Sequence, residues 1–163
     1  MEPINWNQKL KEALDRTEFM AVSTSGIDGV WTNPVAFAYN EKIDLFFISM
    51  MNTRHTQNIL TNQQASAAIF STNRFDDGEV LGLQLQGTIT HLTEKTELKE
   101  ASEYYFTRGA SNDEFKTKTS ALGDLNAMWQ FFRLTPSELW CFDSRTFGEK
   151  RVQVDLMRIN LEL

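Results

Sequence analysis

The chain has few cysteines, histidines and prolines: one, two and three among 163 residues. The single cysteine, Cys141, excludes an internal disulfide and a thiolate zinc cluster, and two histidines that lie far apart in the sequence argue against a metal site. The longest apolar-rich run, residues 45–51, is far shorter than the roughly 20 residues that a membrane-spanning helix needs. Residues 1–6 lack the layout of a signal peptide. We therefore expect a soluble, cytoplasmic protein without a metal and without a membrane contact.

Basic charge is also scarce. Lys and Arg number 16 against 22 Asp and Glu, which gives a formal net charge of −6 and an isoelectric point of about 4.9. Nucleic-acid binding needs a basic surface that displaces phosphate counterions, so we expect no nucleic-acid partner, although a local basic patch could hold one phosphate. Hydrophobic residues make up 41% of the chain, an ordinary globular composition. The length predicts a single domain over residues 1–163.

Hydrophobic periodicity predicts short strands with a few peripheral helices. Helices are expected from residue 6 to about 14, over 52–62 and over 93–106; strands over 19–25, 30–39, 43–49, 65–72 and 80–92; loops over 73–78 and 107–125; a closing hairpin of 127–134 and 138–142 around Thr135-Pro136-Ser137; and an edge strand in the tail from Arg151. Pro34 cannot donate to a β-ladder and should sit at an edge or a bulge. Short strands separated by tight turns favour a barrel or a sandwich.

The strand over 43–49 is apolar on both faces, with Leu45 and Phe47 on one and Phe46 and Ile48 on the other. Such a strand is central in its sheet or is covered by a partner.

The clearest site signal follows that strand, where Ser49-Met50-Met51-Asn52-Thr53-Arg54-His55 leads into a helix. A helix N-terminus exposes unpaired N–H groups and the positive end of the helix dipole, and both favour anions. Arg54 adds a planar guanidinium that suits phosphate oxygens. Ser49 and Thr53 add hydroxyl donors, and His55 can donate from one ring nitrogen. The alternative is an ordinary capped helix with an exposed arginine, and these residues alone leave both interpretations open.

The order of these motifs resembles the pyridoxamine phosphate oxidase-like split-barrel flavoproteins. Thr53-Arg54-His55, followed by Asn58-Ile59-Leu60, resembles the FMN phosphate segment of that family. Thr32-Asn33-Pro34-Val35-Ala36-Phe37 is similar to the strand that lines the isoalloxazine, Leu83-Gln84-Leu85-Gln86-Gly87 to a later strand, and residues 132–140 to the closing hairpin. The resemblance covers roughly residues 10–145.

The resemblance implies a mainly β fold, a six-stranded antiparallel split β-barrel with peripheral helices, with FMN as cofactor. It also implies a homodimer with FMN in clefts between the subunits. The expected FMN-binding residues are Asn33, Val35, Ser49, Met50, Thr53, Arg54, His55, Gln84 and Trp140. Of these, the Thr53-Arg54-His55 segment would hold the phosphate. Gln84 could instead face solvent, and Trp140 could fill the hairpin core rather than cover the flavin of a neighbouring subunit.

The function that the resemblance implies is FMN-dependent redox chemistry on an unidentified small substrate. His55 stands where the family commonly has lysine, and a neutral imidazole holds phosphate less strongly than an ammonium. The C-terminal motif that grips pyridoxine phosphate has no clear match, so we do not expect pyridoxamine phosphate oxidation. No side chain is a convincing acid or base, and no catalytic residue is assigned. The alternatives are a non-catalytic dimer that carries flavin or another anionic ligand as a sensor or store, and a structural dimer with an empty cleft.

Overall fold

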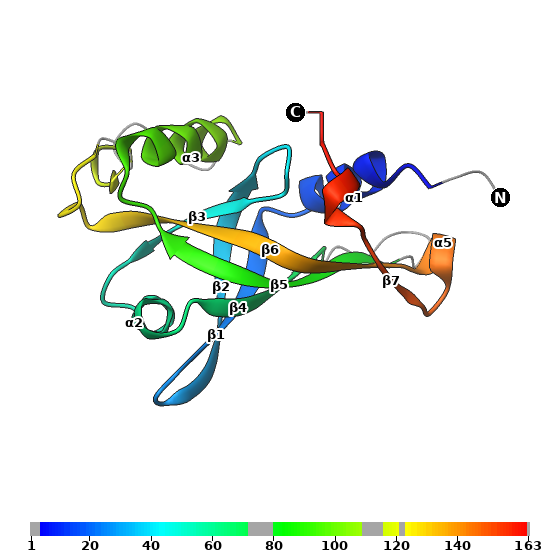
Figure 1. Ribbon diagram of the computed structural model, residues 1–163, viewed down its shortest axis with the longest axis horizontal. Coiled ribbons are helices and arrows are strands. Elements are labelled where there is room, and N and C mark those ends of the chain that lie inside the picture. Colours follow the sequence, from blue (N-terminus) through cyan, green and yellow to red (C-terminus); the bar gives the residue numbers. More distant parts are fainter. Residues whose placement is uncertain (1–3, 72–79, 109–115, 121–122, 163) are drawn as a thin grey trace.

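The computed structural model describes residues 4–71, 80–108, 116–120 and 123–162, and their main body is an antiparallel sheet with helices at its periphery (Figure 1). The strands are β1 (Phe19–Gly26), β2 (Gly29–Tyr39), β3 (Leu45–Met50), β4 (Gln64–Phe70), β5 (Leu81–His91), β6 (Trp129–Asp143) and β7 (Arg151–Gln153). The helices are α1 (Trp6–Asp15), α2 (Arg54–Thr61), α3 (Lys95–Thr107), α5 (Ser144–Phe147) and the 3-10 turn η2 (Leu156–Arg158). Within these ranges no helix combines the length and the apolar character that crossing a membrane requires.

The sheet has seven strands in the order β3-β2-β1-β4-β5-β6-β7, and β3 also pairs with β6. β6 is long enough for both partners, because residues 129–134 pair with β3 and residues 132–143 with β5. This extra pairing joins β3 and β6, the first and the last strand of the order β3-β2-β1-β4-β5-β6. β1 to β6 therefore match the six strands that the family resemblance implied, with β6 in place of the two strands of the predicted closing hairpin. The seventh is the three-residue β7, which adds to the edge of β6 where the tail was expected to supply an edge strand.

The predicted closing hairpin at Thr135-Pro136-Ser137 is wrong, because β6 runs through these residues as one strand. Instead of a turn there is a bulge, where the register against β5 shifts between Gln86 and Gly87 so that Gly87 lies opposite Pro136. A Cβ on Gly87 would lie 2.1 Å from the carbonyl oxygen of Thr135, so only glycine permits this close approach. The bulge accommodates the proline and keeps the strand continuous.

The other strand proline, Pro34, lies in the part of β2 that pairs with β1 alone, since β2 pairs with β3 only at residues 37–39. At this position one side of β2 has no strand partner, so a proline there interrupts no ladder on that side. This agrees with the expected edge position.

β3 is buried from residue 45 to residue 49, as its two apolar faces predict. Leu45 and Phe47 pack in the main core, which also contains residues of α1. Phe46 and Ile48 pack in a second cluster against Leu98 and other residues of α3. The strand is therefore central, and α3 covers its outer face within the same chain.

Of two predicted loops, the structure describes one in part and the other not at all. Residues 73–78 lie outside the described residues, and so do 109–115 and 121–122 of the predicted loop over 107–125. The described part of that loop is attached to the start of β6: Thr119 forms a bridge with Trp129, and Phe131 N donates to Ser120 Oγ at 3.1 Å.

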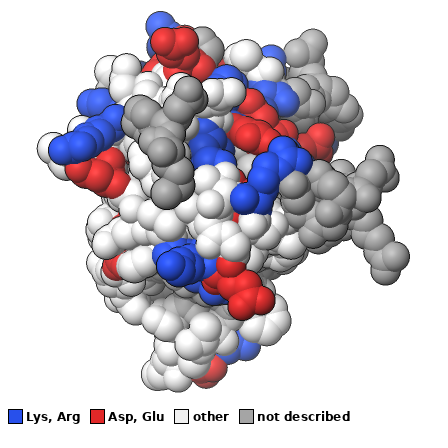
Figure 2. Space-filling view, turned by 90° about the vertical axis from the view of Figure 1, so that its right-hand side faces the viewer, with Lys and Arg blue, Asp and Glu red and all other residues white. Residues whose placement is uncertain are grey.

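Charged side chains of both signs are interspersed on the face seen from the α5 and β7 side of the molecule (Figure 2). Apart from these surface charges, Lys9 of α1 pairs with the buried Asp143 at the end of β6. This ion pair joins the first helix to the far end of the sheet.

Candidate anion-binding site

A cleft of about 600 Å³ lies where β2 and β3 meet the start of α2, and we call it the β2–α2 cleft. It is lined by Trp31, Asn33, Pro34, Val35, Ala36, Ile48, Ser49, Met50, Thr53, Arg54, His55, Tyr105 and Trp129. Seven of the nine residues that we expected at the site are in this set: Asn33, Val35, Ser49, Met50, Thr53, Arg54 and His55. The structure thus brings together residues from two strands and a helix that follow one another in the chain.

Gln84 and Trp140 do not line this cleft. They lie opposite each other on β5 and β6. Gln84 Oε1 accepts a hydrogen bond from Arg151 Nε at 3.2 Å, and Trp140 Nε1 donates to Glu138 Oε1. Contacts of these two residues with flavin therefore stay predictions.

Three aromatic residues of the cleft were not identified from the sequence. Trp31 stands two residues before Asn33, so the period of a strand places both side chains on one face of β2, and this signal was available. Trp129 lies opposite Met50 in the β3–β6 pairing. Tyr105 comes from α3, whose docking onto the outer face of β3 depends on tertiary packing.

The N-terminus of α2 opens toward the cleft with its N-cap side chain engaged elsewhere. Thr53 is the N-cap, in an extended conformation, and makes no capping hydrogen bond. Its hydroxyl donates to the Met50 carbonyl oxygen at 2.9 Å and lies 2.9 Å from Thr56 Oγ1. The N–H groups of the first helical turn are therefore left for another acceptor, at the end where the helix dipole is positive.

Arg54 is oriented by two contacts from the β1–β2 hairpin. Its Nη2 donates to the Asp28 carbonyl oxygen at 2.6 Å, and its Cζ lies 4.6 Å from the centre of the Trp31 ring. Neither contact supplies a negative charge, and no carboxylate of the described residues forms an ion pair with this guanidinium. Its remaining N–H donors can therefore serve an anion.

His55 forms a compact polar cluster with two hydroxyls, which we call the Ser49–Thr53–His55 cluster. The residue is 4% exposed, and its Nε2 lies 2.6 Å from Ser49 Oγ and 3.3 Å from Thr53 Oγ1. The two hydroxyl oxygens are 3.2 Å apart. Burial lowers the pKa of the His55 imidazole, so the ring is neutral at neutral pH. Arg54 is thus the charged side chain of the cleft, and the cluster beside it offers hydrogen bonds.

Side-chain amides fix the direction of α2 on the sheet. Asn58 Nδ2 donates to Thr24 Oγ1 at 3.1 Å, and Asn62 Nδ2 donates to Ser25 Oγ at 2.8 Å. Asn58 also lies against Gly26, where a Cβ would be 2.1 Å from its Oδ1. This close approach holds the helix N-terminus at the cleft.

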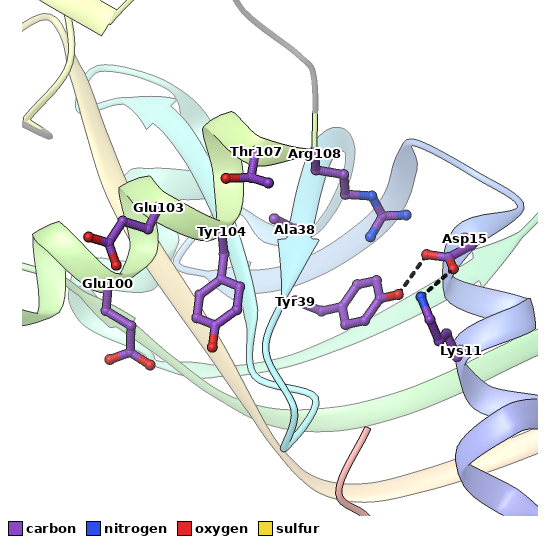
Figure 3. Close-up of a pocket in the computed structure, with 9 residues that line it drawn as sticks. All are labelled: Lys11, Asp15, Ala38, Tyr39, Glu100, Glu103, Tyr104, Thr107 and Arg108. Atoms are coloured by element: carbon purple, nitrogen blue, oxygen red, sulfur yellow. Dashed lines mark hydrogen bonds and ion pairs between the residues drawn. The ribbon is translucent and has the colours of Figure 1, made fainter. Parts of the chain in front are cut away.

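A second cavity, of about 530 Å³, lies between α1, the end of β2 and α3, and we call it the α1–α3 cavity (Figure 3). Asp15 accepts hydrogen bonds there from the Tyr39 hydroxyl at 2.6 Å and from Lys11 Nζ at 2.9 Å. Arg108 Nη2 donates to the carbonyl oxygens of Leu14 and, at 2.9 Å, of Thr17. Lys11, Tyr39 and Asp15 thus bind one another, and Arg108 connects the end of α3 to the end of α1.

The chain is similar to known proteins both in sequence and in fold. The sequence profile of the family described as pyridoxamine 5′-phosphate oxidase matches residues 6–140. No curated protein sequence matches the chain.

Solved structures share the fold at low sequence identity. A protein related to general stress protein 26, from Clostridium acetobutylicum, is 14% identical with a TM-score of 0.65, over 92% of this chain and 94% of that one. A heme binding protein from Mycobacterium smegmatis is 14% identical with a TM-score of 0.73; the match covers 96% of this chain but 60% of the longer protein. A heme storage protein from Vibrio cholerae is 18% identical with a TM-score of 0.63, over 83% and 94%. At these identities the likeness concerns the fold alone.

Proposed function

Because this chain belongs to the pyridoxamine 5′-phosphate oxidase family, we propose that its β2–α2 cleft binds FMN and that the protein uses it for redox chemistry on a small substrate. The observation that carries the proposal is the position of Arg54, whose guanidinium has no carboxylate partner among the described residues and lies beside a helix N-terminus without a side-chain cap. Bound FMN would supply the hydride or electron transfer, while the protein binds and orients the cofactor.

The phosphate end of the cleft fits a phosphate ester. First-turn N–H groups of α2 and the Arg54 guanidinium are donors for phosphate oxygens. Ser49 and Thr53 add hydroxyls to the same end. Arg54 and the helix dipole face the two charges of the ligand, which favours reversible binding over very tight binding.

The remainder of the cleft fits a flat, mostly apolar ring system. Val35 and Ile48, each 7% exposed, contribute apolar surface from β2 and β3. Trp31 and Trp129 contribute aromatic surface. The cleft volume of about 600 Å³ lies within the range of roughly 300–1,000 Å³ that is usual for ligand sites.

A second copy of the chain is the partner that we propose for this site. The β1–β2 hairpin that carries Trp31 also exposes Ile27, at 102%, and Val30, at 72%. Exposed apolar side chains beside a ligand cleft are typical of a protein contact. A homodimer that covers this hairpin would shield both the apolar surface and the cleft from water.

Heme is the ligand of two of the structurally similar proteins, so it is the competing candidate. The described residues of the cleft favour FMN for a specific reason. His55, the histidine of the cleft, is buried, and its Nε2 lies 2.6 Å from Ser49 Oγ, so the ring does not present itself to a heme iron. Cys141 is fully buried, and burial raises the pKa of its thiol to about 11, so it does not offer a thiolate either.

The test begins with an absorbance spectrum of the purified protein, followed by titrations with FMN, riboflavin and heme. We expect saturable FMN binding that Arg54→Ala weakens by about 10- to 100-fold, since a charge-assisted phosphate contact contributes roughly 1.5–3 kcal/mol. Arg158→Ala is the matched control, because Arg158 is exposed in η2 and pairs with Asp155. Absent FMN binding, or equal affinity of the wild-type and Arg54→Ala proteins, would overturn the proposal.

A further measurement separates an enzyme from a binding protein. Anaerobic addition of NADH or NADPH to the FMN-loaded protein bleaches the flavin band if the protein accepts that reductant. Dithionite, which reduces flavin without the protein's help, is the positive control. Flavin that is reduced by dithionite alone would support the alternative of a flavin store or sensor.

A further inference from the structure

We infer that anion binding in the β2–α2 cleft is coupled to the uptake of a proton at His55, so that the site binds phosphate esters more tightly as the pH falls through the neutral range. This inference rests on the proposed function, because it concerns the same site. It is carried by the position of the ring: His55 lines the cleft directly after Arg54 and turns Nε2 toward two hydroxyls.

The hydroxyl partners suit both protonation states of the ring. A hydroxyl can donate to a bare Nε2 or accept from Nε2–H, depending on its rotation. Ser49 Oγ lies 2.6 Å from Nε2, and Thr53 Oγ1, which donates to the Met50 carbonyl, still has an oxygen lone pair for Nε2–H at 3.3 Å. The described residues give Nδ1 no hydrogen-bond partner. The cluster can therefore take up a proton without moving its heavy atoms.

The charges around the ring keep it neutral until an anion arrives. Arg54 and the positive end of the α2 dipole are next to it, and both oppose a second positive charge. Tyr105, which faces the cleft from α3, is a neutral phenol because burial raises its pKa. The residues that β2, β3 and β6 contribute to the described lining are not titratable. In this lining no carboxylate faces His55, so a bound phosphate would be the first negative charge near the imidazole.

A phosphate group would reverse this balance. A nearby opposite charge favours the charged form of an imidazole and raises its pKa, which acts against the lowering caused by burial. The proton comes from solvent and binds to Nε2; no bond to the ligand forms and no electrons move. Phosphate monoesters lose their second negative charge below pH ~6. The coupling should therefore be visible between about pH 6.5 and pH 8.

Calorimetric titration of the whole protein with FMN tests the inference directly. At pH 7, titrations in buffers of different ionisation enthalpy give the number of protons taken up per FMN bound. We expect uptake of about half a proton to one proton, and roughly tenfold weaker binding at pH 8 than at pH 6.5, because affinity follows the protons bound. Riboflavin, which lacks the phosphate, should bind without proton uptake.

The two histidines provide a matched pair of variants. His55→Gln should abolish the proton uptake. His91→Gln should retain it, because His91 lies outside the cleft, 3.3 Å from Gln130 Oε1 and stacked on Phe132. If His55→Gln does not fold, imidazole NMR of the wild-type protein serves instead, with His91→Gln used for assignment; FMN should raise the pKa of His55 alone.

The outcomes are distinguishable. FMN binding without proton uptake, or with uptake that persists in His55→Gln, overturns the inference and leaves FMN binding intact. An absence of saturable FMN binding at every pH overturns the proposed function and the inference together.

Discussion

Two cavities of this molecule, the β2–α2 cleft and the α1–α3 cavity, are similar in size, about 600 and 530 Å³, but the polar groups that line them differ in their hydrogen bonding. In the α1–α3 cavity, Asp15 binds Lys11 and Tyr39, while Arg108 binds backbone carbonyls (Figure 3). In the β2–α2 cleft, the guanidinium of Arg54 and the first turn of α2 keep donors for which the described part of the chain offers no acceptor. Donors without an acceptor, rather than the volume of the cavity, mark the β2–α2 cleft as a candidate binding site. The hydrogen bonds of the α1–α3 cavity hold elements of the fold together.

One nitrogen of the α1–α3 cavity departs from this rule. Arg108 Nη1 is buried and has no hydrogen-bond partner among the residues that the structure describes. The guanidinium lies over Phe37 and Tyr39, with its Cζ 4.5 and 4.8 Å from the ring centres. These aromatic faces offset part of the cost of burying the charge. The rings of Phe37 and Tyr39 therefore compensate in part for the hydrogen bond that Arg108 Nη1 lacks.

Removal of Arg108 and removal of Arg54 should have opposite effects: the first should lower stability, and the second should lower FMN affinity. We expect Arg108→Ala to lower the free energy of unfolding by about 1.5–3 kcal/mol, because the carbonyl oxygens of Leu14 and Thr17 lose a charged donor, and to leave FMN affinity unchanged. Arg54→Ala should weaken FMN binding and barely change stability, because Arg54 is exposed. Urea unfolding and FMN titration of both variants measure this crossed pattern, which parallel losses in either variant would contradict.

Gly26 tests whether the close approach of α2 to β1 positions the cleft. Gly26→Ala places a methyl group against the Asn58 amide and should cost about 1–3 kcal/mol, the usual range for overpacking. It should also weaken FMN binding, because the start of α2 would shift. Adding Asn58→Ala removes the atoms that clash, so the double variant should be more stable than the sum of the two single effects predicts. Strict additivity would show that the clash is relieved in some other way.

The two regions should lose stability in different pH ranges. The pKa of His55 is lowered by burial, so on acidification the unfolded chain gains the proton first, and stability falls below about pH 6.5. Burial alone would raise the pKa of Asp15, but hydrogen bonds from Lys11 and Tyr39 hold it below its usual value. Its contribution is present above about pH 4 and is lost as the pH falls further. Urea midpoints from pH 7 to pH 3 should flatten in the upper range for His55→Gln and in the lower range for Asp15→Asn.

Tyr39→Phe should have the smallest effect. It removes the 2.6 Å hydrogen bond to Asp15 but keeps the ring under Arg108, so we expect a loss of about 0.5–1.5 kcal/mol. FMN affinity should not change. A measurable change in affinity would mean that the α1–α3 cavity communicates with the cleft.

The sequence predicted the cleft where its residues are close in the chain. The order strand, N-cap, arginine and helix is local, and the period of β2 places Asn33 and Val35 on one face. Trp129 could not be placed in this way, because its position depends on the β3–β6 register. The wrong hairpin has the same origin: Pro136 alone suggests a turn, and only its pairing with Gly87 makes a bulge possible.

The double pairing of β6 also sets an order of assembly. β2, β3 and α2 are neighbours in sequence, so the phosphate end of the cleft can form early through short loop closures. The β3–β6 pairing brings Met50 to Trp129 across a large part of the chain. During synthesis the ribosome must release β6 before this wall can dock. The cleft therefore stays incomplete until late in translation, and a ligand could be enclosed only after most of the protein has been made.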